Sequence, residues 1–139
     1  MAKDIYHETV KDALMLDGWK IVKNLIMEKV KRYENAIIEF LNEYAAVYQG
    51  DKEDPLRTEI VSDNQNHHYQ LIRVGWKNRK YFHYCLFHFD IIEGKVWIQA
   101  NNTEEMVGDE LIKRGVPREE IILGFQPEYA RKHSGFGVA

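Results

Sequence analysis

The sequence predicts an α+β fold, in which a long N-terminal helix packs on a four- to five-stranded, mostly antiparallel sheet, with a second helix near the C-terminus. Apolar residues recur every three or four positions through residues 25–49, which is typical of an amphipathic helix. From Thr58 onward, aromatic and β-branched residues dominate with a period of two, which indicates strands. The pair Glu93-Gly94 lies between two of these strands and favours a tight hairpin.

The composition indicates one globular domain. The chain of 139 residues is 45% hydrophobic and 29% charged, and a chain of this length folds without disulfides or a metal. Its net charge of -3 gives no overall attraction to nucleic acid, and its single cysteine, Cys85, cannot form an internal disulfide. The opening MAKDIYHETV lacks the apolar core of a signal peptide, and no apolar run approaches the roughly 20 residues of a membrane span. We therefore expect a cytoplasmic protein without membrane contact.

Two helical segments are expected before the strands. Residues 2–17 carry apolar side chains on one helical stripe and predict a short helix that ends at Asp17-Gly18, because glycine adopts the left-handed cap conformation. A long helix over residues 25–49 follows, and Pro55 prevents its continuation. We interpret its apolar stripe as packing on the chain's own sheet, and a coiled-coil seam is the alternative.

The strands are expected to form a meander of the segments TEIVSD, HYQLIRVGW, YFHYCLFHFDII and KVWIQAN, at residues 58–63, 68–76, 81–92 and 95–101. The segment NNTEE that follows should open the second helix, because Asn and Thr cap free amides and glutamates favour the positive end of the helix dipole. Gly115 should close this helix, and the segment PREEIILGF should lead into a short apolar strand.

The hairpin at Glu93-Gly94 sets the expected register of the sheet. Its two-residue turn pairs Asp90 with Trp97 and His88 with Gln99. Continuing this register through the turn KNRK puts on the core face Ile72, Val74, Cys85, Phe87, Phe89, Ile98 and Ala100. The opposite face receives Tyr69, Arg73, Tyr84, His88, Asp90, Trp97 and Gln99. Hydrophobic burial alone does not select such a mixed aromatic and polar set, so we predict that this face binds a partner.

His88 and Asp90 form the most suggestive pair on this face. Two apart on one strand, they lie about 7 Å apart at the backbone, close enough for the carboxylate to orient the imidazole. The pair fits partner recognition, a plain hydrogen-bonding role, or a catalytic or metal site. A metal needs a third ligand, and His83 and Cys85 are expected on the opposite face. His68, at the junction of loop and strand next to another histidine, is discounted, so we expect no catalytic residue, no metal and no cofactor.

Trp97 and Cys85 each have two interpretations. The indole of Trp97 offers a large rigid surface that stacks on a base or anchors a protein interface, and it equally suits packing under the C-terminal tail. Cys85 is interpreted as a small core residue, with a reactive thiol as the alternative.

An enzyme hypothesis takes Asp63 followed by Glu93-Gly94-Lys95 as the acid and ExK elements of a magnesium-dependent nuclease. A hairpin tip explains the Glu-Gly pair better, because ExK chemistry needs the glutamate and lysine to project together from a strand. Basic residues gather at the turn KNRK and near the end at Arg131 and Lys132. As phosphate contacts they predict weak, salt-sensitive DNA binding.

Three segments carry a family resemblance. HYQLIRVGW (68–76), HFDIIEGKVWIQANNTEE (88–105) and GVPREEIILGFQPEYARKHSGFGVA (115–139) resemble the XisI family, the fdxN element excision controlling factors known from cyanobacteria. The resemblance covers residues 27–139. The preceding segment AKDIYHETVKDALMLDGWKI resembles instead the opening of XisH, a family related to PD-(D/E)XK endonucleases. We therefore predict a XisH-like N-terminal remnant over residues 1–26, frayed or loosely docked and without its nuclease part, joined to a XisI-like domain over 27–139.

The resemblance implies a non-catalytic accessory factor for site-specific excision of a DNA element, acting with a XisH-like partner and a recombinase–DNA complex. It implies only weak or indirect contact with DNA. A partner that restrains a XisH-type nuclease, in the manner of an immunity protein, is the alternative, and a metal-dependent nuclease is a third. Self-association into a homo-oligomer is expected, because a monomer would leave the aromatic face of the sheet exposed.

Overall fold

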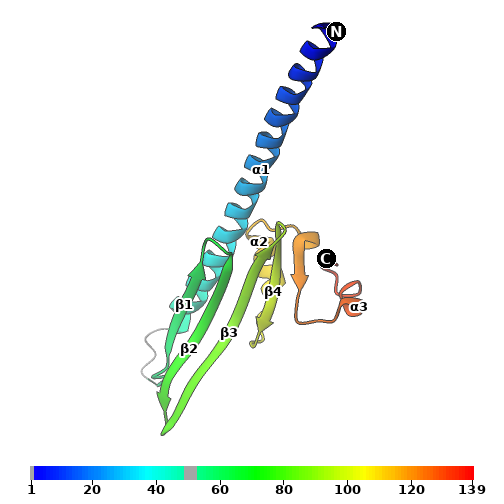
Figure 1. The fold of residues 1–139 in the computed structure, drawn as a ribbon. Helices are drawn as coiled ribbons and strands as arrows, with labels where there is room; N and C mark the ends of the chain where they lie inside the picture. Colours follow the sequence, from blue (N-terminus) through cyan, green and yellow to red (C-terminus); the bar gives the residue numbers. More distant parts are fainter. Residues whose placement is uncertain (1, 49–52) are drawn as a thin grey trace.

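The computed structural model describes the backbone of residues 2–48 and 53–139, and the side chains of residues 15–48 and 53–139 (Figure 1). Its elements in chain order are α1 (Ala2–Tyr48), β1 (Arg57–Asp63), β2 (His68–Lys77), β3 (Lys80–Ile92), β4 (Lys95–Asn101), α2 (Val107–Lys113), a 3₁₀ turn (Arg118–Glu120), β5 (Ile121–Leu123) and α3 (Glu128–Arg131). The strands form one five-stranded sheet in the order β1-β2-β3-β4-β5. The first four strands are antiparallel, and β5 is parallel to β4. The predicted fold class is confirmed.

α1 is one continuous helix that runs through Gly18, so the predicted stop at Asp17-Gly18 is wrong. A glycine inside a helix costs only about 1 kcal/mol relative to alanine, which the helix formers on either side offset. Among the described residues, and apart from the adjacent backbone of the helix itself, no heavy atom lies within 4 Å of a Cβ built on Gly18, so no described tertiary contact requires a glycine there. The predicted helix end at residue 49 lies outside the described residues, and so do the side chains of Tyr6, Val10 and Leu14, which form the apolar stripe predicted within residues 2–17.

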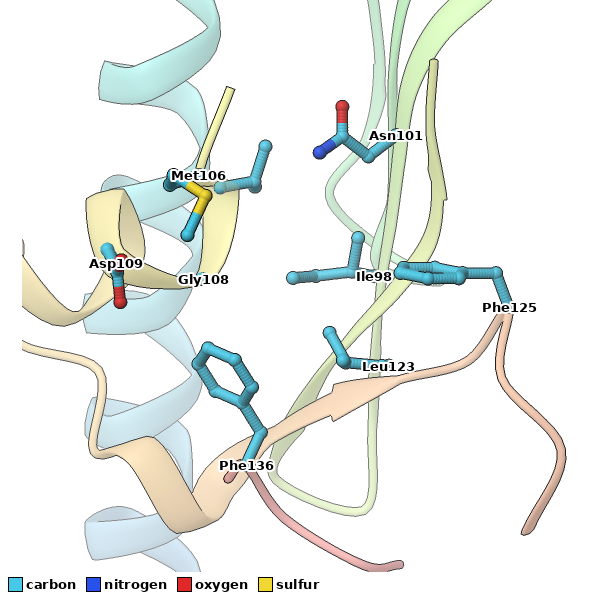
Figure 2. A pocket seen from close by; sticks show the side chains of 9 residues that line it. Ile98, Asn101, Met106, Gly108, Asp109, Leu123, Phe125 and Phe136 are labelled. Atoms are coloured by element: carbon cyan, nitrogen blue, oxygen red, sulfur yellow. The ribbon is translucent and has the colours of Figure 1, made fainter. Parts of the chain in front are cut away.

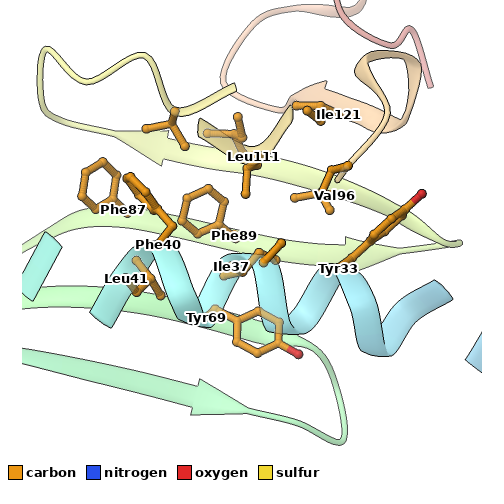
Figure 3. Close-up of a cluster of buried hydrophobic side chains, with 14 of the residues drawn as sticks. Tyr33, Ile37, Phe40, Leu41, Tyr69, Phe87, Phe89, Val96, Leu111 and Ile121 are labelled. Atoms are coloured by element: carbon orange, nitrogen blue, oxygen red, sulfur yellow. The ribbon is translucent and has the colours of Figure 1, made fainter. Parts of the chain in front are cut away.

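The second half of α1 packs across the sheet, and the core lies between them (Figure 3). Ile37 and Leu41 are fully buried on the helix face that meets β3. The ring of Phe40 meets the ring of Phe87 edge-on at 5.2 Å between centroids, which is a favourable arrangement of two aromatic quadrupoles. The interpretation of the apolar stripe as sheet packing is thus confirmed for this half of the helix.

The first half of α1 projects beyond the sheet (Figure 1). Every side chain from Met15 to Glu28 is exposed, and the exposed set includes Trp19, at 64%, and Ile26, at 51%. The expected loose docking agrees with this exposure, while fraying and the XisH-like origin of residues 1–26 stay predictions. No helix among the described residues combines the length and the apolar character that a membrane span requires.

Two β-bulges alter the predicted register. The Glu93-Gly94 turn is confirmed, with positive φ angles of 51° and 74°, and Asp90 pairs with Trp97 as predicted. A shift between β2 and β3 leaves Leu86 without a partner in the ladder, so that Tyr69 pairs with Phe89 rather than with His88. A second shift pairs His88 with Ala100 rather than with Gln99. Bulges of this kind re-aim side chains locally, which changes the membership of both faces.

The second helix begins later than predicted, at Val107, with Met106 at its N-cap and no side-chain cap. The expected capping residues form a turn instead, because the Asn101 carboxamide accepts from the Thr103 backbone N–H at 3.1 Å and the Thr103 hydroxyl accepts from the Glu105 N–H at 3.1 Å. Gly115 ends the helix region with a φ of 98°, as predicted.

The C-terminal segment packs against the rest of the domain. The Gly137 N–H donates to the Ile121 carbonyl at 2.8 Å, and a Cβ on Gly137 would lie 2.3 Å from the Glu119 carbonyl oxygen, so only glycine fits there. The Glu120 carboxylate accepts hydrogen bonds from Lys29 and Tyr33 of α1. These contacts tie β5 and the tail to the helix that covers the sheet.

Removal of residues 1–26 should leave the domain as stable as the full chain, because the described side chains of that segment are exposed. We expect a chain that starts at Met27 to unfold cooperatively, with a melting temperature within about 4 °C of the full chain's, equivalent to roughly 1 kcal/mol for a domain of this size. Circular dichroism of both proteins measures this. A larger loss would show that the N-terminal segment makes stabilising contacts, either with its own domain or with a second copy of the chain.

Asp54→Asn should destabilise the fold by about 1–2 kcal/mol, because the buried Arg73 guanidinium, 4% exposed, would lose its charged partner. Burial raises the pKa of the Asp54 carboxyl, but the Leu56 N–H and the Arg73 charge outweigh it and hold this pKa below its usual value. The stabilisation is therefore present above about pH 4 and is lost as the pH falls through the lowered pKa.

Urea unfolding of the wild type and Asp54→Asn at pH 7 and pH 3 tests this expectation. The matched control is Glu59→Gln, which removes the exposed ion pair with Arg57 and should change the free energy of unfolding by less than about 0.5 kcal/mol. Equal effects of the two variants at pH 7 would contradict the role assigned to Asp54.

Candidate functional site

A polar cluster centred on Asp90 lies on the face of the sheet that is turned away from α1. Phe89 is buried in the core, so the next residue of β3, Asp90, points to the opposite face, and His88 shares that face. His68 lies directly across from Asp90 on β2. The β3–β4 bulge leaves Gln99 unpaired in the ladder beside them. Neighbouring strands thus bring four polar side chains together, which we call the Asp90 cluster.

Asp90 accepts hydrogen bonds on both carboxylate oxygens. Its Oδ1 lies 2.7 Å from His68 Nδ1 and 2.9 Å from His88 Nε2. Its Oδ2 accepts from the Gln99 side-chain amide at 3.1 Å. Behind His88, the Gln70 amide nitrogen lies 3.3 Å from Nδ1. The carboxylate is therefore fixed from one side by an amide and faces two imidazoles on the other.

The electrostatics favour an ionised Asp90. The residue is buried, at 8% exposed, and burial raises the pKa of its carboxyl, but the hydrogen bonds from His68, His88 and Gln99 outweigh burial and hold this pKa below its usual value. The hydrogen bond to Asp90 in turn raises the pKa of the exposed His68. Several donors therefore hold this carboxylate in one position and in its ionised form.

Trp97 borders the cluster and is half-buried under the C-terminal segment. The Arg131 guanidinium lies 4.9 Å from the centre of the indole ring, and its Nε donates to the carbonyl of Gln126 at 3.1 Å. A Cβ on Gly124 would lie 2.3 Å from the Gln99 side-chain oxygen, so a glycine at this position leaves room for the cluster. Trp97 therefore packs beside the tail and stays partly exposed, and its role in binding a partner stays a prediction.

The expected position of Tyr69 and Arg73 on this outer face is wrong. Both lie on the same face of β2 as Leu71, which is the face that packs on the helix. Tyr69 is fully buried opposite Phe89, and burial raises the pKa of its hydroxyl. Arg73 donates to the Thr58 hydroxyl at 2.8 Å and pairs with Asp54. These two residues hold the fold together and are not available to a partner.

Tyr84 and Cys85 also change sides relative to the prediction. Tyr84 pairs with Arg73, and directly opposed residues point to the same face, so Tyr84 lies on the helix side of the hairpin, where it is 41% exposed. Cys85 pairs with Ile72, away from the core face, and burial raises the pKa of its thiol. Its Sγ donates to the Phe87 carbonyl at 3.0 Å, so Cys85 is held as a protonated thiol.

His68 and Gln70 are the residues that the sequence reasoning missed. The sequence signal for them is the alternation of side chains along the strand HYQLIRVGW. Because Tyr69 and Leu71 are both fully buried on one face, His68 and Gln70 lie on the opposite face. The position of His68 across from Asp90 then follows from the β2–β3 bulge. His68, His88 and Asp90 offer ligand atoms that all lie within 4.8 Å of one another. The premise that no third ligand is available was therefore wrong.

Asp63 and Glu93, the two acids of the nuclease hypothesis, both take part in turns. Asp63 accepts from the backbone N–H groups of Gln65 and Asn66 at 3.0 Å each, and Glu93 occupies the hairpin tip. Within the described part of the chain, neither residue belongs to a group of three or more possible metal ligands. The basic residues Lys77 and Lys80 flank the tip of the β2–β3 hairpin, at the end of β2 remote from His68 (Figure 1).

An apolar pocket of about 140 Å³ lies on the other side of the sheet, between α2 and the edge of β4 and β5 (Figure 2). Phe136 fills one side of it and approaches Gly108 so closely that a Cβ on Gly108 would lie 2.4 Å from the ring. Ligand sites of drug size occupy roughly 300–1,000 Å³, so we interpret this pocket as an imperfection in packing.

Comparison with known proteins agrees with this architecture. A XisI-like protein from Anabaena variabilis ATCC 29413 has a crystal structure that superimposes with a TM-score of 0.72 at 35% identity, covering 79% of this chain and 99% of that one. The fdxN element excision controlling factor XisI from the same organism gives a TM-score of 0.69 at 26% identity, covering 80% and 99%. A search of curated proteins gave no match.

The family model described as XisI protein matches residues 27–138, which is the region expected from the sequence. Residues 1–26 lie outside that match. The predicted resemblance is confirmed, and this chain belongs to the XisI family.

Proposed function

We propose that this chain is a non-catalytic factor that controls site-specific excision of a DNA element, and that it acts by binding a XisH-like protein within a recombinase–DNA assembly. Membership of the XisI family carries the proposal, because a solved relative is an fdxN element excision controlling factor. The proposal places the protein in the cytoplasm, with the DNA.

The Asp90 cluster and Trp97 are the proposed docking surface for the XisH-like partner. A polar group held in one geometry gives directional hydrogen bonds, and an aromatic ring beside it gives contact area at low entropic cost. His68 has 55% of its side chain exposed, and His88 has 29%, so both imidazoles remain partly accessible around the buried carboxylate. Of the residues first assigned to this surface, His88, Asp90, Trp97 and Gln99 remain, and His68 joins them.

Self-association is part of the proposal. The exposed half of α1 presents Met15, Trp19, Val22 and Ile26 to solvent, each at least 48% exposed. Apolar side chains at such spacing on a free helix are a common basis for subunit contacts.

Co-expression with a full-length XisH-type protein tests the docking surface. We expect a complex that survives purification, and a loss of affinity of at least about tenfold, or roughly 1.4 kcal/mol, for Trp97→Ala and for His68→Ala. The matched controls are Trp76→Ala and His83→Ala, which replace exposed residues of the same types on the remote part of the hairpin and should change the affinity less than about twofold.

The nuclease activity of the complex separates the two binding roles. A complex without altered nuclease activity favours excision control, and a complex in which nuclease activity falls favours restraint of the nuclease. Equal loss of affinity in the control variants, or no complex at all, would contradict the docking surface.

DNA binding by the isolated chain should be weak and should depend on the β2–β3 hairpin tip. Three phosphate contacts from Lys77, Arg79 and Lys80 predict a slope of about -2.7 in log affinity against log salt, and a dissociation constant above about 10⁻⁶ M at physiological salt. Fluorescence anisotropy with a duplex, at several salt concentrations, measures both values. Replacing the three residues with alanine should flatten the slope, whereas tight sequence-specific capture by this chain alone would contradict the expectation.

A further inference from the structure

The Asp90 cluster has the composition and the layout of a metal site. His68 comes from β2, and His88 and Asp90 come from β3, so two rigid, hydrogen-bonded strands set their positions. Sites built on paired strands hold their ligands more precisely than sites built on loops. The three ligand atoms, two imidazole nitrogens and one carboxylate oxygen, lie within 4.8 Å of one another.

Two of the three separations between ligand atoms already approach those around a bound ion. His68 Nδ1 and His88 Nε2 lie 2.7 and 2.9 Å from the same carboxylate oxygen. Around a tetrahedral ion with bonds of about 2.0–2.1 Å, neighbouring ligand atoms are about 3.3 Å apart. Each imidazole would therefore need to withdraw from Asp90 by about 0.5 Å, and the exposed side chain of His68 is free to make such a rotation.

A second layer of side chains holds the ligands. The Gln99 amide donates to Oδ2 of Asp90 at 3.1 Å, which leaves Oδ1 directed at the imidazoles. The Gln70 side-chain amide lies 3.3 Å from Nδ1 of His88, the ring nitrogen that faces away from the cluster. With the amide turned so that its oxygen accepts from that N–H, Nε2 of His88 is left free to bind. Metal-binding histidines and carboxylates are usually oriented by outer partners of this kind.

The ligand types select the class of ion. Two imidazoles and one carboxylate suit Zn²⁺, Co²⁺ and related transition metals, whereas Mg²⁺ and Ca²⁺ require sites built from oxygen ligands. Three protein ligands leave a fourth position, and the exposure of His68 opens that position to solvent. A donor atom from water or from another molecule can complete the coordination there.

We propose that His68, His88 and Asp90 form a binding site for one divalent transition-metal ion of the zinc class on the outer face of the sheet. In the bound form each neutral imidazole carries its one proton on the ring nitrogen that faces away from Asp90, so that the other nitrogen binds the ion, and Gln99 and Gln70 hold the ligands in place. The site does not depend on the excision-control role, because it is assembled within the isolated chain.

Calorimetry with Zn²⁺ and visible spectroscopy with Co²⁺ on the purified full chain, free of any affinity tag, test the proposal. We expect one ion per chain, a Zn²⁺ dissociation constant of about 10⁻⁶ M or lower, and the intense ligand-field absorption of four-coordinate Co²⁺. His68→Ala should weaken binding at least about 100-fold and should abolish the Co²⁺ absorption, while the exposed position of His68 leaves the fold intact by circular dichroism. Gln99→Ala should weaken binding about tenfold or more.

The controls are His83→Ala and His133→Ala, which replace exposed histidines outside the cluster and should bind Zn²⁺ as the wild type does. Absence of binding to the wild type, unchanged binding by His68→Ala, or displacement of Zn²⁺ by millimolar Mg²⁺ would each overturn the proposal. All measurements use the chain without a partner, so failure of the metal site leaves the test of the docking surface unaffected.

Discussion

The pairing of Tyr69 with Phe89 beneath α1 is the constraint on which the sheet depends. Both side chains are fully buried in the core, and together they fix the register of β2 against β3. Because side chains alternate along a strand, a slip of one residue would turn an entire set of apolar side chains to the solvent. The burial of these two rings therefore also determines what the other face presents: His68 opposite Asp90, with His88 beside them.

The C-terminal segment completes the domain on both faces of the sheet. On the helix side, Glu120 bonds to Lys29 and Tyr33, which links the short parallel strand β5 to α1. On the outer side, Arg131 covers the ring of Trp97. Two glycines of this segment, Gly124 and Gly137, lie where the backbone or a neighbouring side chain approaches too closely for a Cβ. The segment thus supports the core and the candidate site together.

Regular features of this fold could be predicted from the sequence, and irregular features could not. The helical period, the strand limits and the turn at Glu93-Gly94 follow from local propensity, and all appear in the structure. The two bulges have no signature in the sequence, because the unpaired residues Leu86 and Gln99 look like any other strand residue. A helix end at Gly18 was predicted from the conformational preference of glycine alone, but α1 continues through this residue in the structure.

The exposed half of α1 also has a hydrodynamic consequence. The described residues 15–28 form a solvated rod about 21 Å long at 1.5 Å per residue. A compact body that carries such a rod experiences more friction than a sphere of equal mass. Even a single copy of this 16.5 kDa chain should therefore diffuse slowly and elute early from a sizing column, so its apparent size would overstate its mass.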